Sequence, residues 1–241
     1  MADRFYCPGA AGRERLVLEG DEARHLARVL RLGVGAWVEV FDGLGGAWKA
    51  EVAGVSKSAV ELQRTGPPLP DCEPGLSLTI ATAVPKGERF DWLVEKATEI
   101  GVRRLVPVRT ERSVVDPGSA KLERIRRAVV EASKQCGRNR LMEVGATVDL
   151  PALLQEARPG LRVLAHPGGR GLASVSTSGS TDEALLLVGP EGGFTDAEVE
   201  AAERAGFERV GLGPTILRVE TAAVVGCAVL LTQGLTERGK G

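Results

Sequence analysis

The sequence predicts an α/β protein in which a small, mostly β domain precedes a larger domain built on a parallel sheet. Residues 65–75 hold four prolines and two glycines in eleven positions, a composition that neither a helix nor a central strand tolerates. After this segment, short apolar runs alternate with amphipathic helical patterns, as in a sheet of parallel strands joined by helices. We therefore expect a first domain over residues 1–68 and a second over residues 76–241.

The first domain has the pattern of a compact β-barrel with one helix. Asp21 can cap a helix over Glu22–Arg31, where apolar residues recur at helical spacing. Trp37–Phe41 alternates like a half-buried strand, and glycine pairs after it supply turns. Trp48–Val55 and Ala59–Gln63 predict two further strands.

The second domain has five apolar runs that predict strands, and the third and fourth show little alternation, as expected for strands whose sheet is covered on both faces. These runs are Leu76–Val84, Arg104–Val108, Leu161–Ala165, Leu185–Gly189 and Val210–Gly213. Between the third and fourth runs, the Gly- and Ser-rich segment Gly168–Asp182 predicts a mobile loop.

Four helical patterns accompany these strands. Phe90–Ile100 has one apolar face, and Gly101 can terminate it, while Lys121–Cys136 is basic and amphipathic. A capping box of Thr195 and Glu198 starts a third helix that ends before Gly206. The last helix, Thr221–Leu231, is apolar almost all round and should be buried.

The composition narrows the class of protein. Apolar residues make up 43% of 241 positions, with 31 basic and 32 acidic residues, which is typical of a folded chain with a sizeable core. No apolar run reaches the roughly 18 residues of a membrane span, and the N-terminus lacks the apolar stretch of a signal peptide. We expect a soluble cytoplasmic protein. Four dispersed cysteines and two histidines indicate reduced thiols and no metal site.

The charge is unevenly distributed, which matters more than its sum for a nucleic-acid partner. Residues 86–140 carry 14 basic and 8 acidic groups, whereas residues 141–200 carry 3 basic and 9 acidic groups. The middle of the chain is therefore a candidate surface for phosphates. The alternative is a set of ordinary solvated helix faces.

Two glycine- and proline-containing segments follow neighbouring predicted strands, at the sheet edge where open α/β sheets bind ligands. Gly189–Gly193 lets the backbone adopt positive φ and approach another group closely, with Glu191 in mid-turn. Leu212–Arg218 places the apolar residues Ile216 and Leu217 in a loop, where they need a partner. Each segment alone can be a ligand-free turn, but together they predict a pocket. Because no nucleophile or metal motif is present, cofactor chemistry is favoured.

These segments resemble the SPOUT superfamily and, within it, the RsmE-like family of 16S rRNA uridine N3-methyltransferases. The resemblance covers nearly the whole chain and is strongest at GPEGGFTDAE (189–198) and LGPTILRVETA (212–222). Supporting matches include HLARVLRL (25–32), EKATEIGV (95–102) and EASKQCGRNR (131–140). The chain departs from the family at Leu141-Met142, where a proline often stands.

The resemblance implies a PUA-like RNA-binding domain over 1–68 and a SPOUT domain with a deep trefoil knot over 76–241. It also implies a homodimer, 16S rRNA in the small ribosomal subunit as substrate, and S-adenosylmethionine bound in the knot. The cofactor-binding residues that it implies are Ala165, His166, Gly189, Pro190, Glu191, Gly192, Leu212, Gly213, Ile216, Leu217, Arg218 and Thr221.

The implied reaction moves an activated methyl group to N3 of a uridine, so positioning carries much of the work. The N3 proton must leave, which requires a base or a cation that stabilises the uridylate. Arg218 is the candidate cation, and Glu191 or Glu220 is the candidate base. The residues expected to contact RNA are Arg4, Arg24, Arg28, Arg31, Lys86, Arg112 and Arg138.

Two other functions remain open at the level of sequence. One is a different SPOUT activity, such as methylation of tRNA or of a ribose 2′-hydroxyl. The other is a non-enzymatic ribosome-assembly factor that binds RNA through the PUA-like domain.

Overall fold

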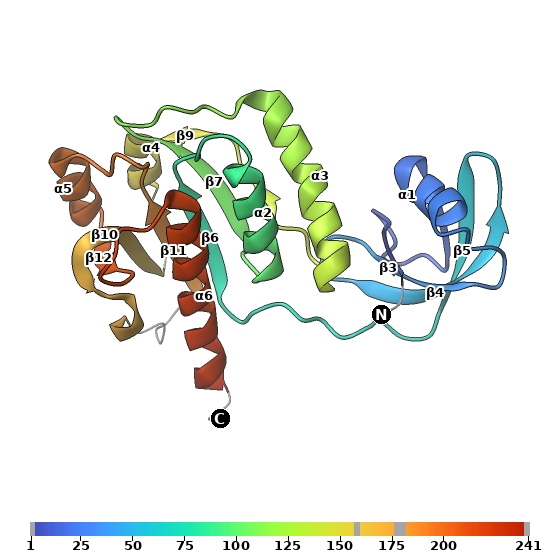
Figure 1. Cartoon of the computed structure of the whole chain (residues 1–241). Coiled ribbons are helices and arrows are strands. Elements are labelled where there is room, and N and C mark those ends of the chain that lie inside the picture. The colour runs from blue at the N-terminus through green and yellow to red at the C-terminus, as the bar shows by residue number, and fades with distance from the viewer. Residues whose placement is uncertain (1–2, 157–159, 176–181, 239–241) are drawn as a thin grey trace. The chain divides into compact units, whose positions relative to one another are not determined.

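The structure of the chain is a computed structural model that describes residues 3–156, 160–175 and 182–238. Its contacts divide the chain into two compact units, coloured along the sequence in Figure 1. Met1–Glu73 and Val130–Leu141 form the first unit, and Pro74–Val129 and Met142–Gly241 form the second. The first unit thus includes residues 130–141, which the sequence pattern assigns to the second domain.

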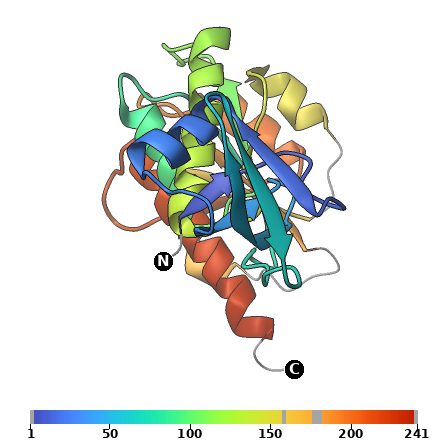
Figure 2. The ribbon, with the colours of Figure 1, turned by 90° about the vertical axis from the view of Figure 1, so that its right-hand side faces the viewer.

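The first unit is a five-stranded sheet with a helical segment after β2 and, over residues 130–136, the end of a longer helix. β1 and β2 are the outer strands of the sheet (Figure 2). The strand order is β1-β3-β4-β5-β2, with β1 parallel to β3 and every other pairing antiparallel. The elements are β1 (Arg4–Tyr6), β2 (Arg15–Glu19), α1 (Gly20–Arg24), the π-helix η1 (His25–Val29), β3 (Trp37–Phe41), β4 (Ala47–Val55) and β5 (Ala59–Thr65).

Strand alternation builds the core of this unit. In β2, Leu16 and Leu18 are buried while Val17 between them is exposed, because successive side chains point to opposite faces. The buried leucines join a cluster that includes Phe5, Leu26, Val38, Val40, Trp48, Val52, Val60 and Leu62.

The helix expected over Glu22–Arg31 differs from the prediction in its start, its type and its end. It begins at Gly20, whose positive φ turns the chain directly out of β2, so Asp21 lies in the first turn and no side chain caps the helix. From His25 the helix widens into a π-turn, with the amide of Leu30 donating to the carbonyl of His25. The left-handed conformation of Arg31 then ends it.

The second unit is a three-layer α/β/α structure, and its parallel sheet confirms the predicted fold class. The strand order is β12-β10-β11-β6-β7-β8, with β9 pairing to β7 and every pairing parallel. The elements are β6 (Ser77–Thr82), α2 (Arg89–Glu99), β7 (Arg104–Arg109), α3 (Gly118–Cys136), β8 (Glu143–Val144), β9 (Val148–Asp149), α4 (Leu150–Gln155), β10 (Leu161–Gly171), the 3₁₀ turn η2 (Leu172–Ser174), β11 (Glu183–Val188), α5 (Asp196–Arg204), β12 (Glu208–Gly211) and α6 (Val219–Arg238).

Both faces of this sheet are covered, as the unbroken apolar strands predicted. Leu185 and Leu187 of β11 pack with α4 and α5, whereas Leu186 between them faces α6. A Cβ on Gly226 of α6 would lie 2.7 Å from the Leu186 side chain, so glycine allows the helix to pack closely on the sheet. In Figure 1, α2 lies beside α6 over this face. None of the helices in the described part of the chain is long and apolar enough to span a membrane.

β10 is longer than predicted, which corrects the expected loop at Gly168–Asp182. The strand continues past Ala165 through a register shift to Gly171, where it still pairs with β12. A Cβ on Gly169 would lie 2.5 Å from the backbone of Val210, so only glycine permits this approach. Residues 176–181 of the expected loop lie outside the described residues.

Candidate functional site

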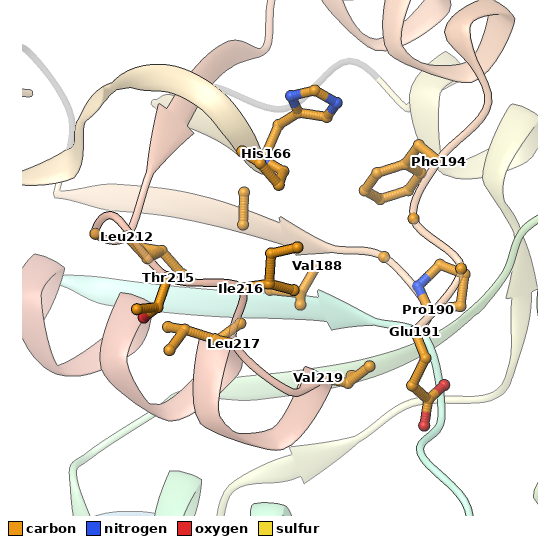
Figure 3. Close-up of a pocket in the computed structure, with 17 residues that line it drawn as sticks. His166, Val188, Pro190, Glu191, Phe194, Leu212, Thr215, Ile216, Leu217 and Val219 are labelled. Atoms are coloured by element: carbon orange, nitrogen blue, oxygen red, sulfur yellow. The ribbon is translucent and has the colours of Figure 1, made fainter.

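Three segments, one within β10 and two at the ends of β11 and β12, enclose a cavity of about 330 Å³, within the size range of small-molecule sites (Figure 3). They are residues 165–167, 188–194 and 212–219, with Ala222 of α6 adding to the wall. Ten of the twelve predicted cofactor-binding residues line this cavity, namely Ala165, His166, Gly189, Pro190, Glu191, Gly192, Leu212, Gly213, Ile216 and Leu217.

The GPEGG segment forms a tight turn that is held from outside the cavity. Gly193 has φ of 69° and its amide donates to the carbonyl of Pro190 at 2.8 Å. A Cβ on Gly189 would lie 2.7 Å from the ring of Phe194, so a side chain there would displace that ring. The guanidinium of Arg112 donates to the carbonyl of Gly192 at 2.8 Å. The turn is therefore fixed before any ligand binds.

Apolar side chains face one another across the cavity. In Figure 3, His166 and Phe194 lie on one side, Leu217 and Val219 on the other, and Ile216 between them. Ile216 is 89% exposed, which is costly for an isoleucine unless something covers it. Nδ1 of His166 is buried and has no hydrogen-bond partner within the described ranges. The cavity thus offers apolar walls and an unsatisfied polar atom to a ligand.

A second cavity of about 520 Å³ adjoins the first and contains the predicted catalytic cation. Its lining residues are Arg89, Trp92, Ile216, Leu217, Arg218, Glu220 and Thr221. Ile216 and Leu217 line both cavities. Arg218 and Thr221 were predicted to bind the cofactor, and the structure places them in this neighbouring cavity instead of the first.

The two candidate bases share one arginine that the sequence pattern did not single out. Nε of Arg89 lies 3.8 Å from Oε1 of Glu220, and Nη1 of Arg89 lies 4.0 Å from Oε1 of Glu191. Glu220 is 7% exposed, whereas Glu191 is exposed. Arg89 opens α2 just beyond the end of β6, the sheet edge that carries the cavities. This position could have identified Arg89 from the sequence, because the start of a helix at this edge of the sheet is a common place for a ligand site.

The predicted RNA-binding residues divide into buried and exposed sets. Arg4 is buried and donates to Oδ1 of Asn139 at 2.7 Å, and Arg138 is buried and donates to both carboxylate oxygens of Glu73. These contacts join residues 130–141 to the rest of the first unit and indicate structural roles. The exposed set is Arg24, Arg28, Arg31, Lys86 and Arg112.

Two of the exposed arginines belong to a basic cavity in the first unit. Arg24, Arg28 and Lys57 line this cavity of about 410 Å³, together with the turn Ser56–Ala59. The hydroxyl of Ser56 accepts from the amide of Ala59 at 3.0 Å, which fixes the turn that carries the lysine. Lys57 was not predicted because it stands alone between two strands in the sequence.

The four cysteines are free, and burial raises the pKa of the thiols of Cys7, Cys136 and, most strongly, Cys227 in α6. In the part of the chain that the structure describes, no three histidine, cysteine or acidic side chains gather in a group that could hold a metal ion.

The comparisons with known proteins agree with this architecture. A family model described as an RNA methyltransferase domain matches residues 72–231, and one described as an RNA methyltransferase PUA domain matches residues 18–63. The chain is thus an RNA methyltransferase with a PUA domain, which confirms the predicted class.

The relatives define the family more narrowly. Ribosomal RNA small subunit methyltransferase E of Synechocystis is 35% identical over 86% of this chain and 69% of that protein. The Bacillus subtilis protein of the same name is 31% identical over 92% of this chain and 91% of its own length. The chain belongs to the ribosomal RNA small subunit methyltransferase E family, as its motifs indicated.

A solved member of this family shares the fold of the whole chain. The enzyme of this name from Neisseria gonorrhoeae, solved bound to S-adenosyl methionine, superposes with a TM-score of 0.89. It is 30% identical, and the match covers 96% of this chain and 98% of that one.

Proposed function

We propose that this protein transfers the methyl group of S-adenosylmethionine to N3 of a uridine in the 16S rRNA of the small ribosomal subunit, in the cytoplasm. The observation that carries the proposal is the preformed cavity bounded by residues 165–167, 188–194 and 212–219, in a chain of a family with a cofactor-bound structure. The bound cofactor would supply an activated methyl group on a positively charged sulfur.

The residues around the first cavity fit this cofactor. Ile216, Leu217 and Val219 offer apolar surface of the kind that a purine ring needs, and Phe194 faces them across the cavity. The backbone of the GPEGG turn offers amides and carbonyls close to the ligand, since glycines leave them uncovered. Nδ1 of His166 supplies a further polar partner.

The catalytic proposal keeps the three residues that the sequence singled out. Arg218 stabilises negative charge on the uracil as the N3 proton leaves, and Glu220 or Glu191 accepts that proton. Glu220 is the better supported of the two carboxylates because it is buried beside the first cavity and one of its oxygens has no partner among the described residues. Glu191 lines the first cavity itself.

RNA binding is assigned to the exposed cations. Arg24, Arg28 and Lys57 surround a cavity whose charge suits a phosphate, and Arg31 lies just after Arg28 in the chain. Lys86 and Arg112 are exposed in the second unit, near the ends of β6 and β7. Arg4 and Arg138 are assigned an indirect role in RNA binding, because they hold residues 130–141 in the first unit.

We also propose the trefoil knot that the resemblance implies. β12 pairs with β10 at the edge of the sheet, whereas α6 packs on β6 and β11 in its middle. Residues 212–218 must therefore cross back over the strand ends, and in our proposal this return threads a loop of the chain. An experimental structure whose chain trace closes without a knot would contradict it.

A second copy of the chain is the proposed partner for the remaining apolar surface. Ile216 and Val225 are exposed apolar side chains on the last loop and on α6. Sedimentation velocity should give a species of about twice the chain mass of 25.4 kDa. A monomer at micromolar concentration would contradict the dimer.

Nucleoside mass spectrometry tests the activity and separates it from its alternatives. Small ribosomal subunits are incubated with the protein and S-adenosylmethionine, and their rRNA is digested to nucleosides. We expect 3-methyluridine. A 2′-O-methylated product alone, or methylation of tRNA instead, would assign a different SPOUT activity. Absence of cofactor binding in calorimetry would indicate a non-enzymatic assembly factor.

A further inference from the structure

The second cavity combines chemical groups that the cofactor does not require. It contains an exposed aromatic ring, two arginines and a buried carboxylate, and it shares the wall formed by Ile216 and Leu217 with the first cavity. A ligand in the second cavity would thus lie beside a ligand in the first. Such a neighbouring site is where the acceptor of a transferred group must bind.

The carboxylate of Glu220 is the group in this cavity most in need of a ligand. Its side chain is nine-tenths buried, and Oε1 lies 3.8 Å from Nε of Arg89. Oε2 is buried without a hydrogen-bond partner in the described part of the chain. Buried polar atoms are normally hydrogen-bonded, so Oε2 indicates a donor that arrives with a ligand.

Trp92 provides a flat surface in the same cavity. It lies three residues after Arg89 in α2, so the two side chains share a face of that helix. The indole is 43% exposed, although tryptophan usually buries most of its large apolar area. Planar nucleobases stack on exposed aromatic rings of this kind.

We propose that the second cavity receives the uracil of the target nucleotide, stacked on Trp92 with its N3–H directed at Oε2 of Glu220. Arg89 is the positioning residue, since its contact with Oε1 leaves Oε2 to accept the proton. This inference rests on the proposed function and adds the residues that hold its acceptor.

The methyl transfer balances with the Glu220 carboxylate as proton acceptor and S-adenosylmethionine as methyl donor. The Glu220 carboxylate takes the N3 proton, and the electron pair left on N3 forms the bond to the methyl carbon. The carbon–sulfur bond breaks, and its electron pair stays on sulfur, which becomes neutral. Arg218, exposed in the same cavity, is available to stabilise the negative charge that appears on the uracil oxygens.

A fluorescence titration tests the stacking surface without relying on turnover. The protein is saturated with S-adenosylhomocysteine and titrated with uridine 5′-monophosphate while tryptophan emission is recorded. We expect quenching in the wild type. Trp92→Ala should lose the quenching, and its Kd for the nucleotide, measured by calorimetry, should rise at least about fivefold, the lower range for one stacked base. The matched control is Trp37→Ala, another exposed tryptophan in the first unit, which should leave the Kd unchanged.

Steady-state kinetics on small subunits test Glu220 and Arg89. Glu220→Gln should lower kcat by about 10²- to 10⁴-fold with little change in KM, as expected when a proton acceptor is removed. Arg89→Ala should also lower kcat, and Arg89→Lys should recover part of it, because a cation again faces Oε1. A purely structural arginine would show no such recovery.

The outcomes separate this inference from the function on which it rests. If the protein binds S-adenosylmethionine in calorimetry but Trp92→Ala keeps both quenching and nucleotide affinity, the uracil site is wrong and the proposed function stands. Unchanged kcat in Glu220→Gln overturns the assigned proton acceptor. If the wild type takes up no S-adenosylmethionine, both proposals fall together.

Discussion

At the scale of single residues, Gly192 illustrates how the site depends on uncovered backbone. A Cβ there would meet only Arg112, at 3.4 Å, and its φ is not positive, so the fold itself has room for a side chain. The residue nevertheless lines the first cavity. A side chain at this position should therefore interfere with the ligand more than with the protein.

Gly192→Val should accordingly weaken binding of S-adenosylmethionine at least about tenfold, or about 1.4 kcal/mol, because the side chain occupies space beside the cofactor. Isothermal calorimetry measures this, and circular dichroism checks the fold. Gly171→Val, where a Cβ meets nothing within 4 Å and which lies outside the lining of this cavity, is the matched control. A folded Gly192→Val protein with wild-type affinity would place the cofactor elsewhere.

Cys227 predicts a pH effect on stability at alkaline pH. Burial raises the pKa of its thiol above the ordinary value of 9.0, so the unfolded chain releases this proton at lower pH than the folded one. The unfolded state then binds fewer protons, and the free energy of unfolding falls as pH rises above about 9, by up to about 1.4 kcal/mol per unit. Urea unfolding between pH 8 and pH 10 should show a shallower decline in Cys227→Ala. Equal slopes in the two proteins would contradict this account.

The turn segments around the first cavity could be predicted because glycine and proline mark unusual backbone in the sequence, whereas the individual cofactor-binding residues came from the family resemblance. The contacts between charged side chains around the cavities could not be predicted from the sequence. Nothing local in the sequence says that Arg89 meets Glu191 and Glu220, which lie about a hundred residues away or more. For the same reason, the burial of Arg4 against Asn139 could not be foreseen, and the exposed residues Arg24 and Arg28 looked no different in the sequence.

At the scale of elements, α5 is a helix whose start was predicted correctly from neighbouring residues in the sequence. Thr195 accepts from the amide of Glu198, and the Glu198 carboxylate accepts from the amide of Thr195, which completes the predicted capping box. The helix buries Val199 and Ala202 in the core beneath the first cavity. Its start therefore fixes the segment that leaves the GPEGG turn.

Thr195→Ala should lower the free energy of unfolding by about 1 kcal/mol, since the Glu198 amide no longer has its acceptor. Chemical denaturation monitored by circular dichroism measures the change. Glu200→Ala, an exposed residue of the same helix in a 3.8 Å ion pair, should change stability by less than about 0.5 kcal/mol. A Thr195→Ala protein as stable as this control would show that the cap is dispensable.

Elements shaped by distant contacts were predicted less well. β10 extends beyond Ala165 because the backbone of Gly169 packs against Val210, a contact that no local pattern reveals. The short strands β1 and β2 lie at the edges of the first sheet and were not predicted from the sequence. The π-helix, in which Leu26 is fully buried, was not predicted from the sequence either.

At the scale of the whole molecule, the near-neutral net charge of −1 conceals separate basic surfaces. The cavity lined by Arg24, Arg28 and Lys57 collects cations from a helix and from a turn about 30 residues later. The sequence could predict the helical part of this surface but not the turn. Such a surface binds phosphates without reading the base sequence.

Arg28→Gln combined with Lys57→Gln should weaken binding to rRNA fragments of any sequence, because each substitution removes a cation that faces a phosphate. The slope of log affinity against log salt should become shallower by about 0.7 to 0.9 for each phosphate that is no longer neutralised. Filter binding across a salt series measures both quantities. Arg204→Gln, an exposed arginine of α5, is the control and should leave the slope unchanged. An unchanged slope in the double variant would remove this surface from the RNA interface.

The central claim is that the chain methylates N3 of a uridine from a cofactor held beside the GPEGG turn. Primer extension by reverse transcriptase on 16S rRNA tests it most directly, because a methyl group at N3 blocks base pairing and stops the enzyme. Subunits lacking this modification, treated with the protein and S-adenosylmethionine, should give one new stop one nucleotide before a uridine, and Gly192→Val should not. Read-through of the whole rRNA after treatment with the wild-type protein would contradict the claim.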